Sequence, residues 1–449
     1  MSRVLAFLAV VAGVADASSC GSFGMKSTVV DATTFGMTWV TTANSSHEVV
    51  KIVVTPTAAR GVAAQTYVLT KCTDSADKNE IAAEYPGAAV ISVPVNGLSA
   101  VDTVQIALLE TLGVYTKLRA FPSPLLISSD VVRTWIQDPV NSVESYPGAG
   151  FGTDYAAHSA VTGVDVLMSS VYQYGPFGAI NDYNASGVLD KMVLINELDE
   201  STPLGRAEWI KVVGLLTGKE SNADSLYSTT KANYETAKKF AAAAVSQPKV
   251  WYNGFYTNIW SSPVSTEWYP AKSGQYTYQY LADAYTEYVL PSSEVFSSNG
   301  GLSWARGVAL ANKAEFWLSN SQSWASLSAA AAVVSADSTV DFKTLANVPS
   351  FQCENVWDND LSAVLYSGSI YPRNDFFESA VMHPDQVLKE IIMIVHPELS
   401  SIGTHKYFRK VPRGTLSADN CPFDASEDTS DDSDASDSGS SSSSSTSST

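Results

Sequence analysis

The chain has 449 residues, and its 45% hydrophobic content is ordinary for a globular protein long enough to form two cores. Its formal charge of −19 falls to −11 once the eight acidic residues of 419–449, a segment without Lys or Arg, are set aside. An acidic body with an acidic tail argues against nucleic-acid binding, because nucleic-acid phosphates require a basic surface.

The first 17 residues have the pattern of a secretory signal peptide. Arg3 precedes an apolar run from Val4 to Val14, and Ala15-Asp16-Ala17 fits a cleavage site, so the mature chain is expected to start near Ser18. The residues just before Cys20 lack the leucine of a lipoprotein signal. No later segment supplies the roughly 18 apolar residues of a membrane span. We therefore expect a secreted or cell-surface protein.

The cysteine content predicts disulfides. Four cysteines form an even set in a secreted chain, and none lies in a CxxC motif that would suggest metal or redox chemistry. We therefore expect no metal site. Three pairings are possible, and the one that keeps both partners within one end of the chain joins Cys20 to Cys72 and Cys353 to Cys421.

Residues 18–90 alternate polar and apolar positions, which predicts a strand-rich N-terminal extension that packs as hairpins on the first lobe. From Ala88 the pattern changes to short apolar strands followed by helices, which is typical of parallel α/β units. We expect an N-terminal α/β lobe over 91–220, a connecting helix over 221–246 and a C-terminal α/β lobe over 247–400.

The segment Ile195 to Glu220 reads as the hinge between the lobes. Its first residues close an apolar strand, and Pro203 occupies a position that the first turn of a helix tolerates. Ile210, Val213 and Leu216 then recur at helical spacing. A second, longer helix is expected from about Asn222 to Ala244.

The C-terminal segment, residues 401–449, ends in a nearly pure Ser and Thr run that follows an acidic stretch. Such a sequence cannot bury enough apolar surface to fold, so we expect a disordered tail. It could serve as a solvated spacer, as a glycosylated stalk or as a phosphorylated, cation-binding tail. Asn44 and Asn184 lie in glycosylation sequons and are acceptor candidates in a eukaryotic source.

Three motifs resemble one family in the right order along the chain. They are LLETLGVYTKL at 108–118, STPLGRAEWIK with GLLTGKE at 201–220, and NDFFESAVMHPDQVLKEIIMIVHPEL at 374–399. These segments look like those of class III substrate-binding proteins of ABC transporters, which carry siderophores, haem or cobalamin. The resemblance implies two Rossmann-like lobes joined by a long helix, a small-molecule micronutrient complex as ligand and a membrane receptor or transporter, here unidentified, as partner. Monomer is the default for this architecture.

In α/β lobes ligands bind beyond the carboxyl ends of the strands, and the loops expected there are rich in aromatic residues. Lys249 with Trp251, and Phe376 to Glu378, resemble the K-x-W and F-W-E elements of algal cobalamin acquisition proteins, with Phe377 in place of the Trp. A broad flat ring suits aromatic walls. The candidate ligand-binding residues are Lys249, Trp251, Phe255, Trp260, Tyr172, Tyr174, Arg373, Phe376, Phe377 and Glu378.

The charge of these loops bears on the ligand. Anionic siderophores require several cations, and the loops offer chiefly Arg373 and Lys249, whereas cobalamin needs shape, aromatic contact and hydrogen bonds. Capture of cobalamin or a related tetrapyrrole is therefore the preferred function. The alternatives are an iron-siderophore binding protein that takes neutral hydroxamates, and an extracellular matrix protein that binds through its acidic Ser-rich tail.

The sequence gives no sign of an enzyme. Its five histidines are scattered, and it contains no HExxH, GxSxG or P-loop motif. We expect no catalytic residue and no resident cofactor.

Overall fold

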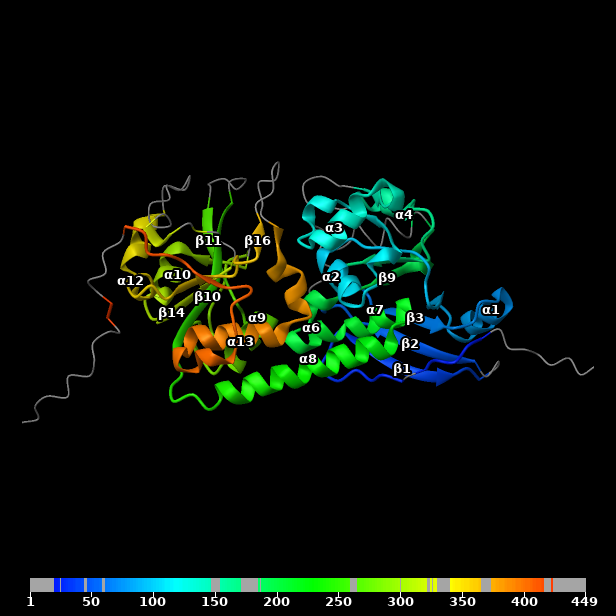
Figure 1. Cartoon of the computed structure of the whole chain (residues 1–449), viewed down its shortest axis with the longest axis horizontal. Helices are drawn as coiled ribbons and strands as arrows, with labels where there is room; N and C mark the ends of the chain where they lie inside the picture. Colours follow the sequence, from blue (N-terminus) through cyan, green and yellow to red (C-terminus); the bar gives the residue numbers. More distant parts are fainter. Residues whose placement is uncertain are drawn as a thin grey trace, which may run out of the picture.

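In the computed structural model the described residues are 20–24, 26–43, 47–58, 61–146, 154–170, 185, 187–258, 265–298, 300–320, 324, 326–328, 340–364, 373–415 and 421–422. Two α/β lobes lie side by side along the long axis, and one long helix runs beneath both (Figure 1). The predicted fold class, two α/β lobes joined by a long helix with a strand-rich extension, is confirmed. The predicted signal peptide, the two sequon asparagines Asn44 and Asn184, and the tail from residue 423 onward lie outside the described residues.

The N-terminal extension forms a four-stranded sheet in the order β1-β2-β3-β4. β1 (Phe35–Thr41), β2 (Glu48–Val54) and β3 (Gln65–Thr70) are antiparallel hairpin strands, and α1 (Ser75–Glu84) leads to β4 (Ala89–Ser92), which pairs parallel to β3. The predicted boundary at residue 90 therefore falls inside a strand of this sheet. Inward residues such as Ile52 and Leu69 join the core of the N-terminal lobe, so the extension packs on that lobe.

The N-terminal lobe contains a parallel five-stranded sheet in the order β7-β6-β5-β8-β9. Its strands are β5 (Leu98–Ser99), β6 (Leu118–Phe121), β7 (Glu144–Ser145), β8 (Val166–Ser169) and β9 (Met192–Leu194). α2 (Thr103–Thr111) and α3 (Asp130–Gln137) follow β5 and β6, and α4 (Tyr155–Ser159) precedes β8. The carboxyl ends of these strands face the second lobe, as the predicted cleft requires.

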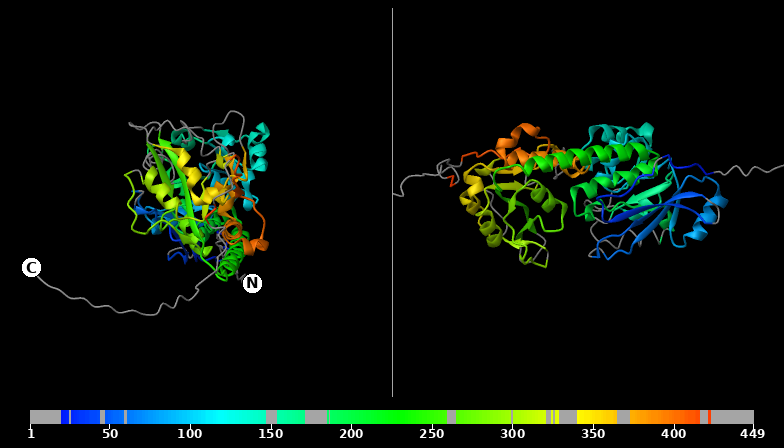
Figure 2. Two further views of the ribbon diagram at one scale, coloured as in Figure 1. Left: turned by 90° about the vertical axis from the view of Figure 1, so that its left-hand side faces the viewer. Right: turned by 90° about the horizontal axis from the view of Figure 1, so that it is seen from below.

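Three helices form the hinge. α6 (Pro203–Glu208) begins with the proline that the sequence placed there, α7 (Ile210–Thr217) ends at Gly218 in the left-handed conformation (φ 74°), and α8 (Glu220–Ala241) contains 22 residues. At 1.5 Å per residue α8 is about 33 Å long, enough to reach from one lobe to the other. Figure 2 shows it along the length of the molecule.

The C-terminal lobe is built on a seven-stranded mixed sheet. Its path is β13-β11-β10-β14-β15-β18, with β12 paired to β10. The strands are β10 (Lys249–Asn258), β11 (Ser265–Pro270), β12 (Glu287–Tyr288), β13 (Leu302–Ser303), β14 (Phe316–Ser319), β15 (Val356–Asp358) and β18 (Arg409–Lys410); β16 (Ala363–Val364) and β17 (Arg373–Asn374) form a separate pair. α9 (Tyr276–Asp283), α10 (Trp304–Ala311), α12 (Pro349–Gln352) and α13 (Pro384–Val395) complete the lobe, and α13 packs along α8.

Both predicted disulfides are confirmed. Cys20 is bonded to Cys72 in the extension, and Cys353 is bonded to Cys421 at the end of the C-terminal lobe. Among the helices of the described residues, none is long and apolar enough to cross a membrane.

A close approach in the C-terminal lobe supplies a stability test. A Cβ atom on Gly307 in α10 would lie 2.2 Å from the ring of the fully buried Trp268, whose indole N–H donates to the Trp304 carbonyl. Gly307→Ala should therefore lower the free energy of unfolding by about 1–3 kcal/mol, since the ring has to move. Gly36→Ala, whose Cβ would meet no atom within 4 Å, is the matched control. Equal denaturant midpoints for both variants would contradict this packing.

Candidate functional site

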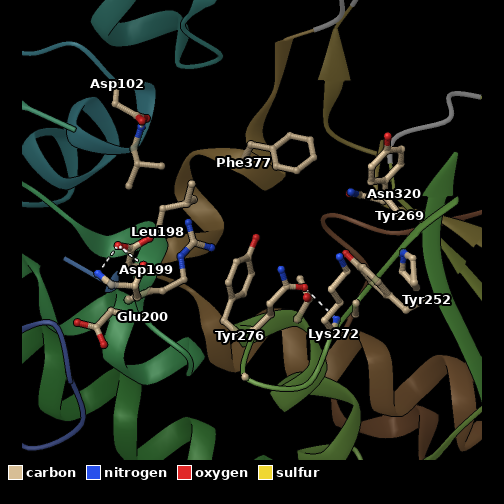
Figure 3. Close-up of a pocket in the computed structure, with 18 of the residues that line it drawn as sticks. Asp102, Leu198, Asp199, Glu200, Tyr252, Tyr269, Lys272, Tyr276, Asn320 and Phe377 are labelled. Atoms are coloured by element: carbon tan, nitrogen blue, oxygen red, sulfur yellow. Dashed lines mark hydrogen bonds between the residues drawn. The ribbon is translucent and has the colours of Figure 1, made fainter. Parts of the chain in front are cut away.

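A cavity of about 620 Å³ lies between the two lobes (Figure 3). One wall consists of residues that follow β5 and β9 of the N-terminal lobe, together with α6. The other consists of residues at the ends of β11 and β14, the start of α9 and one residue near β17. The volume falls within the range of about 300–1,000 Å³ that is usual for small-molecule sites. The principal lining residues are Asp102, Thr103, Val104, Leu198, Asp199, Glu200, Arg206, Tyr252, Tyr269, Lys272, Gln275, Tyr276, Asn320 and Phe377.

The wall from the C-terminal lobe is aromatic. Tyr252, Tyr269, Tyr276 and Phe377 all line the cavity, and Phe377 is 42% exposed. Figure 3 shows Phe377 between the two walls, Tyr269 beside Asn320, and Tyr276 on the floor. Aromatic faces of this kind offer large contact areas with few rotatable bonds, which suits a flat or ring-containing ligand.

Arg206 joins the two lobes at the floor of the cavity. The guanidinium of this buried residue donates to the Glu197 carboxylate at 2.6 Å and lies over the Tyr276 ring, 4.0 Å from its centroid. Burial by itself would lower the pKa of Arg206, but the neighbouring Glu197, together with Tyr276 and Tyr280, outweighs burial and keeps the pKa above its ordinary value. The charge of Arg206 is therefore already matched within the protein.

The ammonium group of Lys272, a second cation in the cavity lining, also contacts other parts of the protein. Its ammonium donates to the carbonyl oxygen of Gly300 and lies over the Phe296 ring, 4.0 Å from its centroid. Burial lowers the pKa of this lysine. Among the described residues that line the cavity, the two cationic side chains thus differ: Arg206 is neutralised by a carboxylate, whereas Lys272 is held by a carbonyl oxygen and an aromatic ring and keeps its charge.

The wall from the N-terminal lobe carries carboxylates. Asp102 caps α2, accepts a hydrogen bond from the Val104 amide at 2.9 Å, and has its pKa raised to about 6, first by burial and then by the negative charge of Glu197. Asp199 accepts from the amide of Thr57 at 3.0 Å. This wall therefore favours ligand groups that donate hydrogen bonds or carry positive charge.

Arg373 and Glu378, predicted as ligand contacts, instead join the two lobes. The Glu378 carboxylate is 3% exposed and accepts from the amide of Ser128 at 2.9 Å and from its hydroxyl at 2.6 Å. Arg373 donates to the carbonyl of Ile127 at 3.2 Å. We call these two contacts the interlobe latch. Both side chains therefore contact the N-terminal lobe, and neither is among the residues that line the cavity.

Three other predicted contacts lie away from the cavity. The Trp251 ring is 0% exposed and packs in the core against Trp268 and Tyr288, with ring centroids 6.3 and 6.1 Å away, respectively. Phe255 packs edge-on against Trp268 on the same face of β10. Lys249 lies at the amino end of β10, whereas the cavity lies at the carboxyl ends of the strands.

The remaining predicted residues divide between the core and the undescribed loops. Phe376 is 7% exposed and packs edge-on against Phe408 in the core of the C-terminal lobe. Tyr172, Tyr174 and Trp260 lie outside the described residues. Phe377 is thus the one predicted ligand-binding residue that the described part of the chain places in the cavity lining.

Sequence reasoning missed four prominent lining residues. Asp102 and Arg206 follow the ends of strands or begin the hinge, and the rule that ligands sit beyond carboxyl ends could have pointed to them. Tyr269 and Tyr276 flank a turn that follows an antiparallel strand, β11, which the expected parallel alternation did not include.

No family model matches the chain, and no curated protein sequence matches it. Solved structures similar to it include a possible iron-binding (periplasmic solute-binding) protein from Staphylococcus epidermidis, with 12% identity, a TM-score of 0.47, and 68% of this chain and 99% of that one covered. CeuE from Helicobacter pylori with Ni(II) bound has 11% identity and a TM-score of 0.49, covering 71% and 90%. A periplasmic heme-binding protein from Pseudomonas aeruginosa has 13% identity and a TM-score of 0.44, covering 68% and 93%. These likenesses concern the fold alone.

The burial of Trp251 predicts a stability effect. Trp251→Ala should lower the free energy of unfolding by about 3–5 kcal/mol, because it leaves a large hole beside Trp268. Phe377→Ala, in which an exposed ring is removed, should change it by less than about 1 kcal/mol. Urea denaturation of both variants measures the difference, and a Trp251→Ala protein as stable as the parent would remove Trp251 from the core.

The interlobe latch predicts a pH dependence. Burial raises the pKa of Glu378 to about 8, despite its hydrogen bonds from Ser128. The native state then holds a proton that the unfolded chain releases near pH 4.5, so Glu378 should lower stability progressively as the pH rises from about 4.5 to 8. The free energy of unfolding of Glu378→Gln relative to the parent should therefore increase across this window. A constant difference between the two proteins would refute the raised pKa.

Proposed function

We propose that this chain is a secreted solute-binding protein that captures a ring-containing micronutrient complex, cobalamin by preference, in the cavity between its lobes. The observation that carries the proposal is the cavity itself, with aromatic side chains on one wall and carboxylates on the other. The family resemblance of the three sequence motifs supports the same interpretation.

The polar groups of the cavity favour a ligand without net negative charge. Arg206 is paired with the Glu197 carboxylate and the Lys272 ammonium is held by the Gly300 carbonyl, while Asp102 offers a ligand an acceptor carboxylate and the tyrosines offer hydroxyls that accept or donate. Cobalamin is rich in carboxamide N–H donors around a flat ring, so it matches both walls. A ferric catecholate, which is strongly anionic, would meet uncompensated carboxylates.

A neutral or cationic ferric hydroxamate is the second candidate, because it also tolerates the carboxylate wall. The matrix-protein alternative rests on the acidic tail, which lies outside the described residues, and gains nothing from the cavity.

No reaction is proposed: binding and delivery to a membrane receptor or transporter make up the function. The two lobes are joined by α8 and by the interlobe latch, so the aromatic wall should be largely preformed and the ordering cost of binding low.

Calorimetric titration of the mature protein with cyanocobalamin tests the proposal. We expect binding at micromolar affinity or tighter, and Tyr276→Ala should weaken it by at least about tenfold because it removes one ring of the cavity floor. Tyr278→Ala, on the same helix but not among the lining residues, is the matched control. Binding of a ferric hydroxamate without binding of cyanocobalamin would favour the second candidate. Absence of heat with both ligands would leave the solute-binding proposal without support.

A further inference from the structure

The N-terminal extension contains a cluster of four potential metal ligands, none of which lines the interlobe cavity. Cys20, His47, Cys72 and Asp77 each offer one donor atom, and these four atoms all lie within 4.8 Å of one another. Among the described residues this is the one group of three or more such side chains that could hold a metal ion. These residues have no motif spacing, so the sequence alone predicts no metal site here.

Four separate parts of the extension meet at this cluster. Cys20 and Cys72 face each other across an isolated β-bridge, His47 immediately precedes β2, and Asp77 lies in the first turn of α1. The His47 Nε2 atom lies 3.3 Å from the Asp77 carboxylate, and the Cys20 sulfur lies 3.4 Å from the same carboxylate group. The fold therefore directs two sulfurs, one imidazole and one carboxylate at a common point.

The cluster is also partly removed from water. Cys72 is fully buried beside Val49, Val68 and Ile81, and His47 is 9% exposed, with no hydrogen-bond acceptor or donor matched to its Nε2 atom. The Asp77 side chain is 24% exposed, which leaves an entry path for a small ion. Two sulfurs, one nitrogen and one oxygen around a point match the donor types that zinc binds in tetrahedral sites.

We propose that this cluster is a zinc-binding site that its own disulfide keeps closed. In the oxidised chain both sulfurs are committed to the Cys20–Cys72 bond. A dithiol reductant supplies two electrons and two protons, breaks the S–S bond to give two thiols, and is itself oxidised to a cyclic disulfide. Zinc then displaces the two thiol protons to solvent and takes both thiolates, the neutral His47 imidazole and the Asp77 carboxylate.

The same chain provides a control disulfide. Cys353–Cys421 has Glu354 as its chain neighbour, but that carboxylate is paired with Arg413 at 2.6 Å and with Lys410 at 3.8 Å. The described residues around this disulfide do not include a histidine and carboxylate grouped with it. Reduction should thus create a zinc site at one disulfide and not at the other.

The experiment measures zinc binding by the full mature chain before and after reduction with a phosphine, which does not compete for zinc. The C353S/C421S variant should bind one zinc ion when reduced and none when oxidised, whereas C20S/C72S should bind none in either state. Cobalt in place of zinc should give thiolate-to-metal charge-transfer absorption in the reduced C353S/C421S protein only. Circular dichroism establishes that each variant is folded.

His47→Gln keeps every cysteine and tests the site without altering either disulfide. Loss of a direct ligand should weaken zinc binding by at least about tenfold, since even the partners of ligands are worth that much. The proposal is overturned if reduced, folded C353S/C421S protein binds no zinc, or if C20S/C72S or His47→Gln binds zinc as tightly as the parent. None of these outcomes depends on the ligand of the interlobe cavity.

Discussion

Buried carboxylates that accept backbone amide hydrogen bonds hold this molecule in one arrangement. Glu208 of α6 is fully buried and accepts from the amides of Val30, Asp31 and Ala32, and its neighbour Glu200 accepts from Thr33 and Thr34. Such charge-assisted bonds are stronger than neutral ones. They tie the segment that precedes β1 to α6 and to the residues before it, and the ion pair between Asp31 and Lys231 adds a contact with α8.

Contacts between charged or polar side chains within the protein also determine what the cavity offers a ligand. Arg206 is neutralised by Glu197 at the cavity floor, and Glu378 and Arg373 of the interlobe latch contact the N-terminal lobe outside the cavity lining. What remains exposed to a ligand is mainly aromatic surface and acceptor oxygen atoms. The selectivity that we propose for uncharged or cationic ring-containing ligands follows from this arrangement.

The N-terminal extension carries a disulfide and the proposed zinc site, which are separate from the interlobe cavity. Its small core, formed by Val49, Val68, Cys72 and Ile81, closes over the Cys20–Cys72 disulfide and brings His47 and Asp77 to its side. If the proposed site exists, the chain binds zinc there when the Cys20–Cys72 disulfide is reduced and not when it is oxidised, independently of the interlobe cavity. A binding protein of this kind would respond to the thiol chemistry of its surroundings.

The sequence by itself determined the α/β alternation and the hinge helices, because these depend on local periodicity and helix-start residues. It left three cysteine pairings open, and the structure contains the one that keeps both partners within one end of the chain. Only the tertiary structure decided which side chains reach the cavity. Both faces of β10 are covered, with Val250 and Tyr252 packed in one core and Trp251 in another, so alternation along the strand does not separate core from ligand contact. Arg373 and Glu378 likewise required the opposite lobe, whose Ser128 lies 250 residues from Glu378 in the chain.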